Sequence, residues 1–283
     1  MQGKTCMVTG ATSGIGLVTA KALAEKGATL VVVGRDPDRT QATVTQIQSD
    51  TGNQAVTGLS ADLSSRERVA RLASEFRDQS ARLDVLVNNA GAIFKKRALS
   101  VDGTEMTFGL NHLGYFLLTH RLEDLLKASA PSRVVNVASD AHRSGRIDFD
   151  DLQGERRYSG WRAYCQSKLA NVLFTYQLAD RLTDAGVTVN TLHPGFVATN
   201  FGRNNRGMFG LKIRLSMRIG AVSPTEGAET VIYLASSSDV DGVTGKYFYN
   251  KRVVQSSPSS YDTQLAQRLW QTSLALTGLQ ETR

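Results

Sequence analysis

A glycine-rich turn near the N-terminus constrains the fold of this chain more than any other feature. It covers residues 9–16, TGATSGIG, and follows an apolar run at 4–9 that predicts a buried strand. From Gly14 onward apolar residues recur at helical spacing, which predicts a helix. Such a turn lets the backbone approach a pyrophosphate, which the helix N-terminus then faces. Because the spacing is G-x-x-x-G-x-G and not G-x-G-x-x-G, an ordinary loop between strand and helix remains the alternative.

Strands and helices alternate along the rest of the sequence. Apolar, β-branched runs bounded by turn residues predict strands at 4–9, 29–34, 55–60, 83–87, 132–138, 187–193 and 246–249. Helices fill the gaps, and Ser64 with Glu67 and Ser223 with Glu226 have the spacing of capping boxes. This alternation predicts a doubly wound, parallel α/β sheet in one domain over residues 1–283.

Composition narrows the class of protein. The 283 residues are 41% hydrophobic, which suits one domain with a core on both faces of a sheet. The net charge is +7, but Lys and Arg are spread along the chain, so we expect no nucleic-acid partner. The two cysteines, Cys6 and Cys165, are too few for a disulfide framework, and no residue cluster predicts a metal site. The sequence has no run of roughly 18 apolar residues and no signal peptide before the first strand, so we expect a cytoplasmic protein without a transmembrane segment.

A tyrosine and a lysine stand four residues apart in a predicted helix at 163–185. Residues at this spacing lie on one helix face, so Lys168 can favour ionisation of the Tyr164 phenol. A phenol tuned in this way can exchange a proton with a carbonyl oxygen near neutral pH. The alternative is a surface tyrosine beside a lysine whose stem lies along apolar surface.

A serine ends the apolar strand predicted at 132–138. Ligands in open α/β sheets bind beyond the carboxyl ends of the strands, which is where Ser139 stands. The alternative for this serine is a role in a turn or a helix cap.

Taken in order, these segments resemble the short-chain dehydrogenase/reductase family, over most of the chain from Lys4 to about Tyr249. The resemblance includes Asp62-Leu63, the run 88–91 (NNAG), Asn111 in a helix expected at 109–126, and Pro194-Gly195. The runs 164–174 and 193–195 are similar to the retinol dehydrogenase and WW-domain oxidoreductase branch. The resemblance implies a seven-stranded parallel sheet and reversible hydride transfer between a nicotinamide cofactor and an alcohol or carbonyl.

The resemblance also implies roles for individual residues. Tyr164 would donate the proton, Ser139 would bind the substrate oxygen, and Lys168 would hold the nicotinamide ribose. Asn111 would hold a water that links Lys168 to solvent, and Thr199 would contact the carboxamide. The full set of expected cofactor contacts is Gly10, Thr12, Ser13, Gly14, Ile15, Gly16, Arg35, Arg39, Asp62, Leu63, Asn88, Ala90, Gly91, Tyr164, Lys168, Pro194, Gly195, Val197 and Thr199.

The end of the second predicted strand indicates which cofactor is used. Enzymes specific for NAD commonly carry an acidic residue there, whereas this chain has Gly34 followed by Arg35. A guanidinium suits the 2′-phosphate of NADP, and Arg39 can assist it. Asp36 precedes Pro37 and is better explained as a helix N-cap. We therefore expect NADP(H).

Two irregular stretches interrupt the pattern, at 140–162 and 201–221. The second mixes apolar and basic residues, so we expect a flap over a lipophilic substrate, with peripheral membrane contact as a further role. Its alternative is packing on the core or at a subunit contact, and monomer and homo-oligomer both stay open. A helical extension is expected after residue 250.

Three other functions remain as alternatives. One is a non-catalytic NADP-binding regulator, and another is a module that binds an anionic surface. A third is a nucleotide-sugar epimerase on the same fold.

Overall fold

The computed structural model describes residues 1–197 and 222–280. The expected flap at 201–221 and the predicted cofactor contact Thr199 lie outside these described residues.

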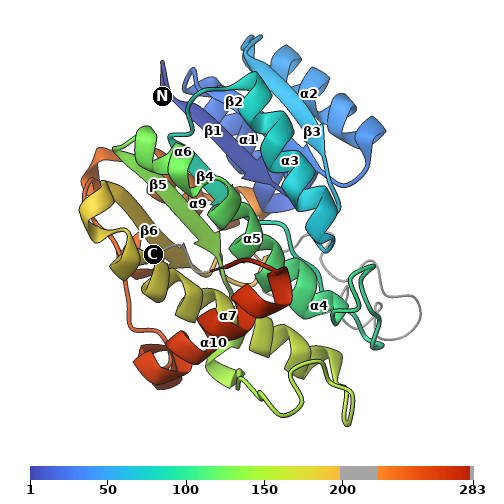
Figure 1. Cartoon of the computed structure of the whole chain (residues 1–283). Helices are drawn as coiled ribbons and strands as arrows, with labels where there is room; N and C mark the ends of the chain where they lie inside the picture. Colours follow the sequence, from blue (N-terminus) through green and yellow to red (C-terminus); the bar gives the residue numbers. More distant parts are fainter. Residues whose placement is uncertain (198–221, 281–283) are drawn as a thin grey trace.

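A central sheet organises the molecule, with strand order β3-β2-β1-β4-β5-β6-β7-β8 (Figure 1). Neighbouring strands are parallel as far as β7, which confirms the doubly wound α/β prediction. The strands are β1 Thr5–Thr9, β2 Thr29–Gly34, β3 Val56–Ser60, β4 Val85–Asn88, β5 Ser132–Val137, β6 Val187–Leu192, β7 Tyr247–Tyr249 and β8 Arg252–Val253.

The sheet of the described residues has eight strands, one more than expected. The additional strand, β8, runs antiparallel to β7 and consists of Arg252 and Val253, which are both exposed. A turn with Asn250 and Lys251 at φ of 48° and 62° joins the two strands. So short and exposed a strand has no apolar periodicity, which explains why the sequence pattern missed it.

Helices cover both faces of the sheet (Figure 1). Alternate strand residues point to opposite faces. Cys6 and Val8 therefore join one apolar core, whereas Met7 joins the other. The first core is covered by α1 Gly14–Glu25, α2 Pro37–Thr51 and α9 Pro224–Ser236. The second is covered by α3 Arg66–Gln79, α5 Gly114–Arg121, α6 Glu123–Ala128 and α7 Gly160–Arg181, with α10 Thr263–Thr277 packed beside α7.

The helix expected at 109–126 is interrupted. It consists of α4 Met106–Phe108, a π-helical turn η1 Gly109–Leu113, and then α5 and α6. Asn111 lies in the π-helical turn. Such turns are rare in proteins, but those that occur often lie at functional sites. No local propensity predicts them. The described residues also form 3-10 helices, which are η2 Asp140–Ser144, η3 Thr183–Ala185, η4 Ser238–Val240 and η5 Pro258–Tyr261.

Helix caps follow the sequence signals closely. Asp36 caps α2 by accepting from the Arg39 N–H at 2.9 Å, and Ser223 with Glu226 forms the predicted capping box. The capping box predicted for Ser64 was wrong. Ser65 caps α3, while the Ser64 hydroxyl donates to Asp62 Oδ1 at 2.7 Å.

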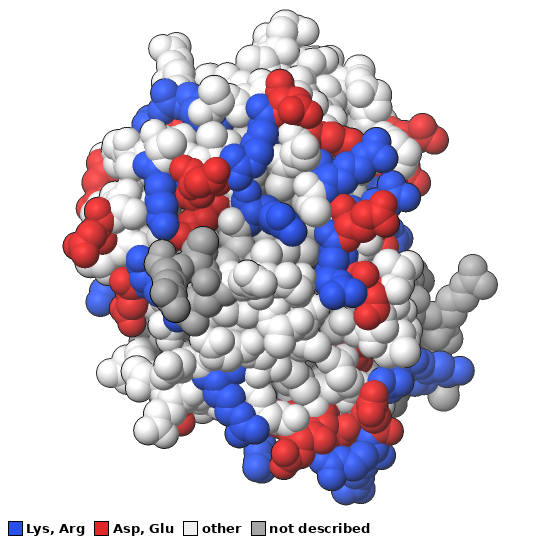
Figure 2. All heavy atoms as spheres, viewed as in Figure 1, with Lys and Arg blue, Asp and Glu red and all other residues white. Residues whose placement is uncertain are grey.

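The surface carries both signs of charge. Figure 2 shows Lys and Arg interspersed with Asp and Glu over one face of the molecule. Across the part of the chain that the structure describes, no helix is both long and apolar enough to cross a membrane.

Candidate active site

A cavity of about 1140 Å³ lies at the carboxyl ends of the parallel strands. This is where ligands bind in open α/β sheets. The cavity brings together most of the residues predicted from the sequence, although they come from the ends of six strands and from helices such as α7, which carries Tyr164 and Lys168. The predicted residues that line it are Gly10, Thr12, Ser13, Gly14, Ile15, Gly16, Arg35, Arg39, Asp62, Leu63, Ala90, Gly91, Ser139, Tyr164, Lys168, Pro194, Gly195 and Val197.

The glycine turn is closely packed against the chain that follows β4. A Cβ on Gly10 would lie 2.8 Å from Ala90 Cα, and one on Gly16 would lie 2.4 Å from Gly10 O. Gly10 and Gly14 also have φ of 64° and 56°, which side chains rarely adopt. The turn can therefore be built only with glycine at these positions.

The N-terminus of α1 opens toward the cavity. Ser13 is its N-cap residue, but within the described structure its side chain makes no capping hydrogen bond. The first backbone N–H groups of a helix need acceptors, and a phosphate supplies them. The residues present therefore fit the pyrophosphate of a dinucleotide.

Asn89 is the asparagine of the run 88–91 that lines the cavity. Its side-chain N–H donates to Thr9 O at 2.9 Å, and the Thr9 hydroxyl accepts from the Asn89 N–H at 2.9 Å. These bonds join the ends of β1 and β4 under the glycine turn. The run 88–91 therefore does mark the cavity lining, but through Asn89 and not through the predicted contact Asn88.

Asn88 occupies a different place from the one expected. It is fully buried, and its amide donates to Thr119 Oγ1 at 3.0 Å and to Asn136 Oδ1 at 2.9 Å. The side chain therefore ties the centre of the sheet to α5, away from the cavity lining.

The end of β2 has no room for a side chain at Gly34. A Cβ there would lie 2.2 Å from Thr40 Oγ1 and 2.6 Å from Thr12 Cγ2. An acidic residue of the kind that binds a ribose 2′-hydroxyl is absent from the sequence, and any side chain there would have to displace Thr40 or Thr12. Arg35 and Arg39, both exposed, line the cavity beside this position.

Ser139 and Tyr164 meet at the floor of the cavity. Burial raises the pKa of Tyr164 to about 12. The hydrogen bond between the two side chains lowers this pKa, but by less than burial raises it. The Ser139 hydroxyl also accepts from the Ala141 N–H at 3.3 Å. Ser139 therefore caps the short helix η2 Asp140–Ser144 and also lines the cavity, so the cap does not exclude the site role expected for it.

Lys168 does not lower the pKa of Tyr164 as the spacing suggested. Its ammonium donates to Val137 O at 2.9 Å and lies 5.8 Å from the centre of the Tyr164 ring. The lysine is buried, and desolvation lowers its own pKa to about 7. The helical spacing put the two residues on one face, as predicted, but burial dominates the pKa of each.

Asn111 is fully buried beneath the cavity lining. Its side-chain oxygen accepts from the Ala92 N–H at 2.9 Å, and its amide donates to Ala92 O and to the Ser167 hydroxyl, each at 3.0 Å. Its backbone oxygen accepts from Asn171 at 2.9 Å. These contacts fix the chain after β4 against α7, next to Lys168.

Three aromatic side chains that sequence reasoning missed also line the cavity. Trp161, Phe196 and Tyr249 line it while remaining 53%, 52% and 38% exposed. His193 stacks on Tyr249 at 4.0 Å between ring centres, and burial lowers its pKa to about 4. The ring is therefore neutral near pH 7. The aromatic residues come from separate segments with no shared sequence motif.

Comparison with known proteins identifies the family. Residues 4–208 match the sequence model of the family described as short chain dehydrogenase. Human retinol dehydrogenase 13 is 43% identical over 98% of this chain and 86% of its own length. Human retinol dehydrogenase 11 is 42% identical over 99% of this chain and 87% of its own length.

Solved structures agree with this relationship. The crystal structure of an uncharacterized protein from Mycobacterium paratuberculosis has a TM-score of 0.80 and 34% identity, covering 100% of this chain and 96% of that one. The complex of Pseudomonas aeruginosa RhlG with NADP has a TM-score of 0.70 and 31% identity, covering 88% and 94%. The chain belongs to the short-chain dehydrogenase family, in its retinol dehydrogenase-like branch. It is thus an oxidoreductase of a family that binds nicotinamide cofactors.

Proposed function

We propose that this protein is an NADP(H)-dependent oxidoreductase that interconverts a lipophilic alcohol with its aldehyde or ketone. The observation that carries the proposal is the convergence of Ser139, Tyr164 and Lys168 on the cavity that also holds the glycine turn. We assign the activity to a single domain over residues 1–283 located in the cytoplasm.

The residues around the glycine turn would hold the cofactor. The N-terminus of α1 would face the pyrophosphate, while Asp62 and Leu63 would flank the adenine. When bound, NADP(H) supplies or accepts the hydride at the substrate carbon. Pro194, Gly195, Val197 and Thr199 would hold the nicotinamide end.

Tyr164 is the proposed acid and base. With a pKa raised to about 12, its hydroxyl is protonated near neutral pH and can donate to the oxygen of a carbonyl substrate. Ser139 would donate a hydrogen bond to the same oxygen and orient it. Lys168, whose pKa is lowered to about 7, is suited to exchange the proton with solvent. Asn111 would position Lys168 and the chain after β4.

The preference for NADP(H) rests on the end of β2. Gly34 carries no carboxylate, and its crowded surroundings disfavour one, while Arg35 and Arg39 offer positive charge at the cavity lining. A planar guanidinium can bind a phosphate through two parallel hydrogen bonds. The complex of RhlG with NADP supports this assignment.

A lipophilic substrate is supported by the aromatic residues Trp161, Phe196 and Tyr249 and by the similarity to retinol dehydrogenases. We include retinoid-like, steroid-like and fatty aldehydes in this class. The sequence of 201–221 supports a role as a substrate flap, which remains a proposal.

The test is a panel of aldehydes and ketones of increasing chain length and ring number, with turnover followed by loss of NADPH absorbance. NADH is assayed in parallel. We expect turnover of apolar carbonyls with NADPH and little with NADH. Binding of NADPH without turnover of any carbonyl or alcohol would instead favour the non-catalytic regulator.

A further inference from the structure

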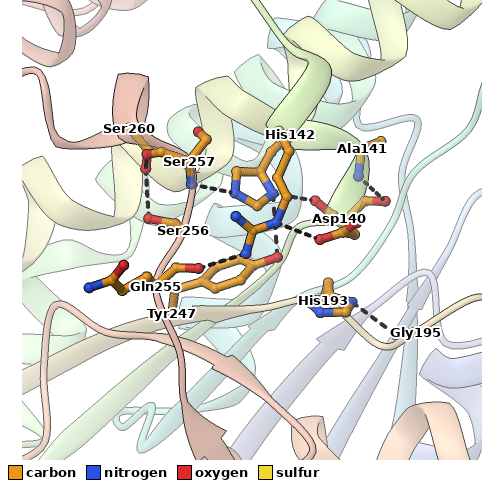
Figure 3. Close-up of polar contacts among 12 residues, drawn as sticks. Asp140, Ala141, His142, His193, Gly195, Tyr247, Gln255, Ser256, Ser257 and Ser260 are labelled. Carbon is orange, nitrogen blue, oxygen red and sulfur yellow. Dashed lines mark hydrogen bonds and ion pairs between the residues drawn. The ribbon is translucent and has the colours of Figure 1, made fainter.

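A buried histidine stands three residues after Ser139. His142 belongs to η2 and is 0% exposed, and its neighbours Ala141 and Arg143 line the cavity. Figure 3 shows its ring near Tyr247 and Ser257. Its Nδ1 lies 2.8 Å from Ser139 O, and its Nε2 lies 3.0 Å from the backbone N of Ser257. The hydroxyl of Tyr247 lies 3.3 Å from the same Nδ1. One ring thus links Ser139 to Ser257, which lies 115 positions beyond His142 in the sequence.

The two backbone partners determine which ring nitrogen carries the proton. The Ser257 N–H can only donate, so Nε2 must accept and carry no hydrogen. The Ser139 carbonyl can only accept, so Nδ1 must donate. The neutral Nδ1–H form satisfies both bonds, whereas an imidazolium would place a second donor against the Ser257 N–H.

The charged and titratable groups around the ring agree with a neutral state. Burial is the largest influence and lowers the pKa of His142. Asp140 and Arg143 on η2 have opposite effects on this pKa, and they pair with each other at 2.8 Å. Tyr247 and His193 complete the surroundings from β7 and the end of β6.

The segment that carries Ser257 is itself firmly attached. We call residues 254–261 the C-terminal brace. The carbonyl of Gln255 accepts from Arg143 at 2.6 Å, and the Ser256 hydroxyl lies 2.7 Å from that of Tyr176 on α7. Within the brace, Ser260 bonds Ser256 at 2.6 Å and Ser257 O at 2.6 Å (Figure 3). His142 therefore bonds to a fixed support.

We propose that His142 is a positioning residue for the reaction, which holds the Ser139 backbone against the C-terminal brace and so directs the Ser139 hydroxyl toward Tyr164. The Ser139 carbonyl also accepts from the His142 backbone N–H at 3.1 Å, so the ring adds a second hydrogen bond to the same oxygen. Without the ring, this oxygen keeps only the backbone hydrogen bond within η2, and the link from Ser139 to the C-terminal brace is lost. The inference rests on the proposed catalytic role of Ser139.

Three variants test this proposal with the full chain. His142→Leu removes both ring hydrogen bonds at similar volume, and His142→Gln restores one donor and one acceptor. Tyr176→Phe is the matched control, because it removes one hydroxyl contact of the brace, while the brace stays attached through Arg143 and Gln255 and the bonds of His142 stay in place. For each variant, kcat and KM are measured together with NADPH affinity and thermal stability.

We expect His142→Leu to lower kcat on the order of 10- to 100-fold, because a displacement of about 1 Å in a reacting group has effects of this size. NADPH affinity should be unchanged, and His142→Gln should recover part of kcat. Tyr176→Phe should lower thermal stability but keep kcat. If kcat in His142→Leu stays at the wild-type value, or falls no more than in Tyr176→Phe, His142 does not position Ser139.

A measurement on the unmodified protein covers the case in which His142→Leu does not fold. NMR of protein labelled at the histidine ring nitrogens should show His142 protonated at Nδ1 and still neutral below pH 6.5, the ordinary pKa of histidine. A proton on Nε2 would overturn the proposal. Ser139→Ala distinguishes a failure of the proposed function from a failure of the role proposed for His142. If Ser139→Ala retains full turnover, the proposed function fails. If turnover depends on Ser139 but not on His142, only this inference fails.

Discussion

The two ends of the cavity are built in different ways. The cofactor end is formed mainly by backbone, and its glycines at 10, 14 and 16 follow one another in a single turn. The proposed catalytic end is formed by side chains: Ser139 follows β5 as the N-cap of η2, and Tyr164 lies on α7, while the C-terminal brace contacts η2 through the Ser257 N–H and His142. The cofactor end therefore depends on the space left by the absence of side chains at its glycines. The proposed catalytic end depends on hydrogen bonds between segments that are distant in sequence.

This difference predicts how each end responds to substitution. At the catalytic end, removing a single polar atom should reduce turnover while binding and folding persist. At the cofactor end, adding a methyl group should disturb packing, and removing a charge should change cofactor preference alone. The following experiments test this contrast, beginning with the largest expected effect.

Tyr164→Phe should reduce turnover about 10²- to 10⁴-fold, since positioned acid–base catalysis contributes this much. The change removes only the hydroxyl, so NADPH affinity should stay close to that of the wild type. Steady-state kinetics and a fluorescence titration with NADPH measure the two quantities. A variant that keeps more than about a tenth of wild-type turnover would rule out Tyr164 as the essential acid.

Lys168→Met should abolish turnover and yet increase the free energy of unfolding. Burial lowers the pKa of Lys168 from 10.5 to about 7, so between these values the unfolded chain binds the proton and the folded chain does not. The contribution of Lys168 to the free energy of unfolding of the wild type therefore rises with pH between about 7 and 10.5. This contribution is lowest below pH 7. The inactive variant should be more stable than the wild type at pH 6, by roughly a few kcal/mol.

Urea denaturation of both proteins at a series of pH values measures this difference, which should narrow toward pH 10. The exposed Lys26→Met variant controls for loss of one positive charge. A stability difference that does not depend on pH would contradict the desolvation of Lys168.

Arg35→Ala should weaken NADPH binding on the order of 10- to 100-fold while changing NADH binding little. The estimate follows from the loss of a hydrogen bond to a charged group, about 1.5–3 kcal/mol. Arg68→Ala, a change of an exposed arginine on α3, is the matched control. Equal weakening of both cofactors would mean that Arg35 does not bind the 2′-phosphate.

Gly34→Ala should destabilise the fold by about 1–3 kcal/mol, because the new Cβ would overlap Thr40 Oγ1 and Thr12 Cγ2. Gly109→Ala is the control, since a Cβ there would meet Thr104 at 3.6 Å, an ordinary contact. Thermal unfolding of both variants gives the comparison. A Gly34→Ala protein as stable as the wild type would show that the end of β2 can accept a side chain.

The sequence by itself determined the alternation of strands and helices, the glycine turn and the spacing of Tyr164 and Lys168. These features depend on contacts within a few residues, such as the period of buried apolar positions and the intrinsic freedom of glycine. The caps at Asp36 and Ser223 were predictable for the same reason, because each bonds a residue three positions away.

The tertiary structure decided which polar residues face the cavity and how burial sets their pKa values. Asn88 and Asn89 are neighbours in sequence, yet the alternation of a strand turns one into the sheet and the other toward the glycine turn. Burial, which the sequence spacing does not report, raises the pKa of Tyr164 and lowers that of Lys168. The π-helical turn at Asn111 and the bond from Ser257 to His142 arise only when distant segments pack together, so no local pattern encodes them.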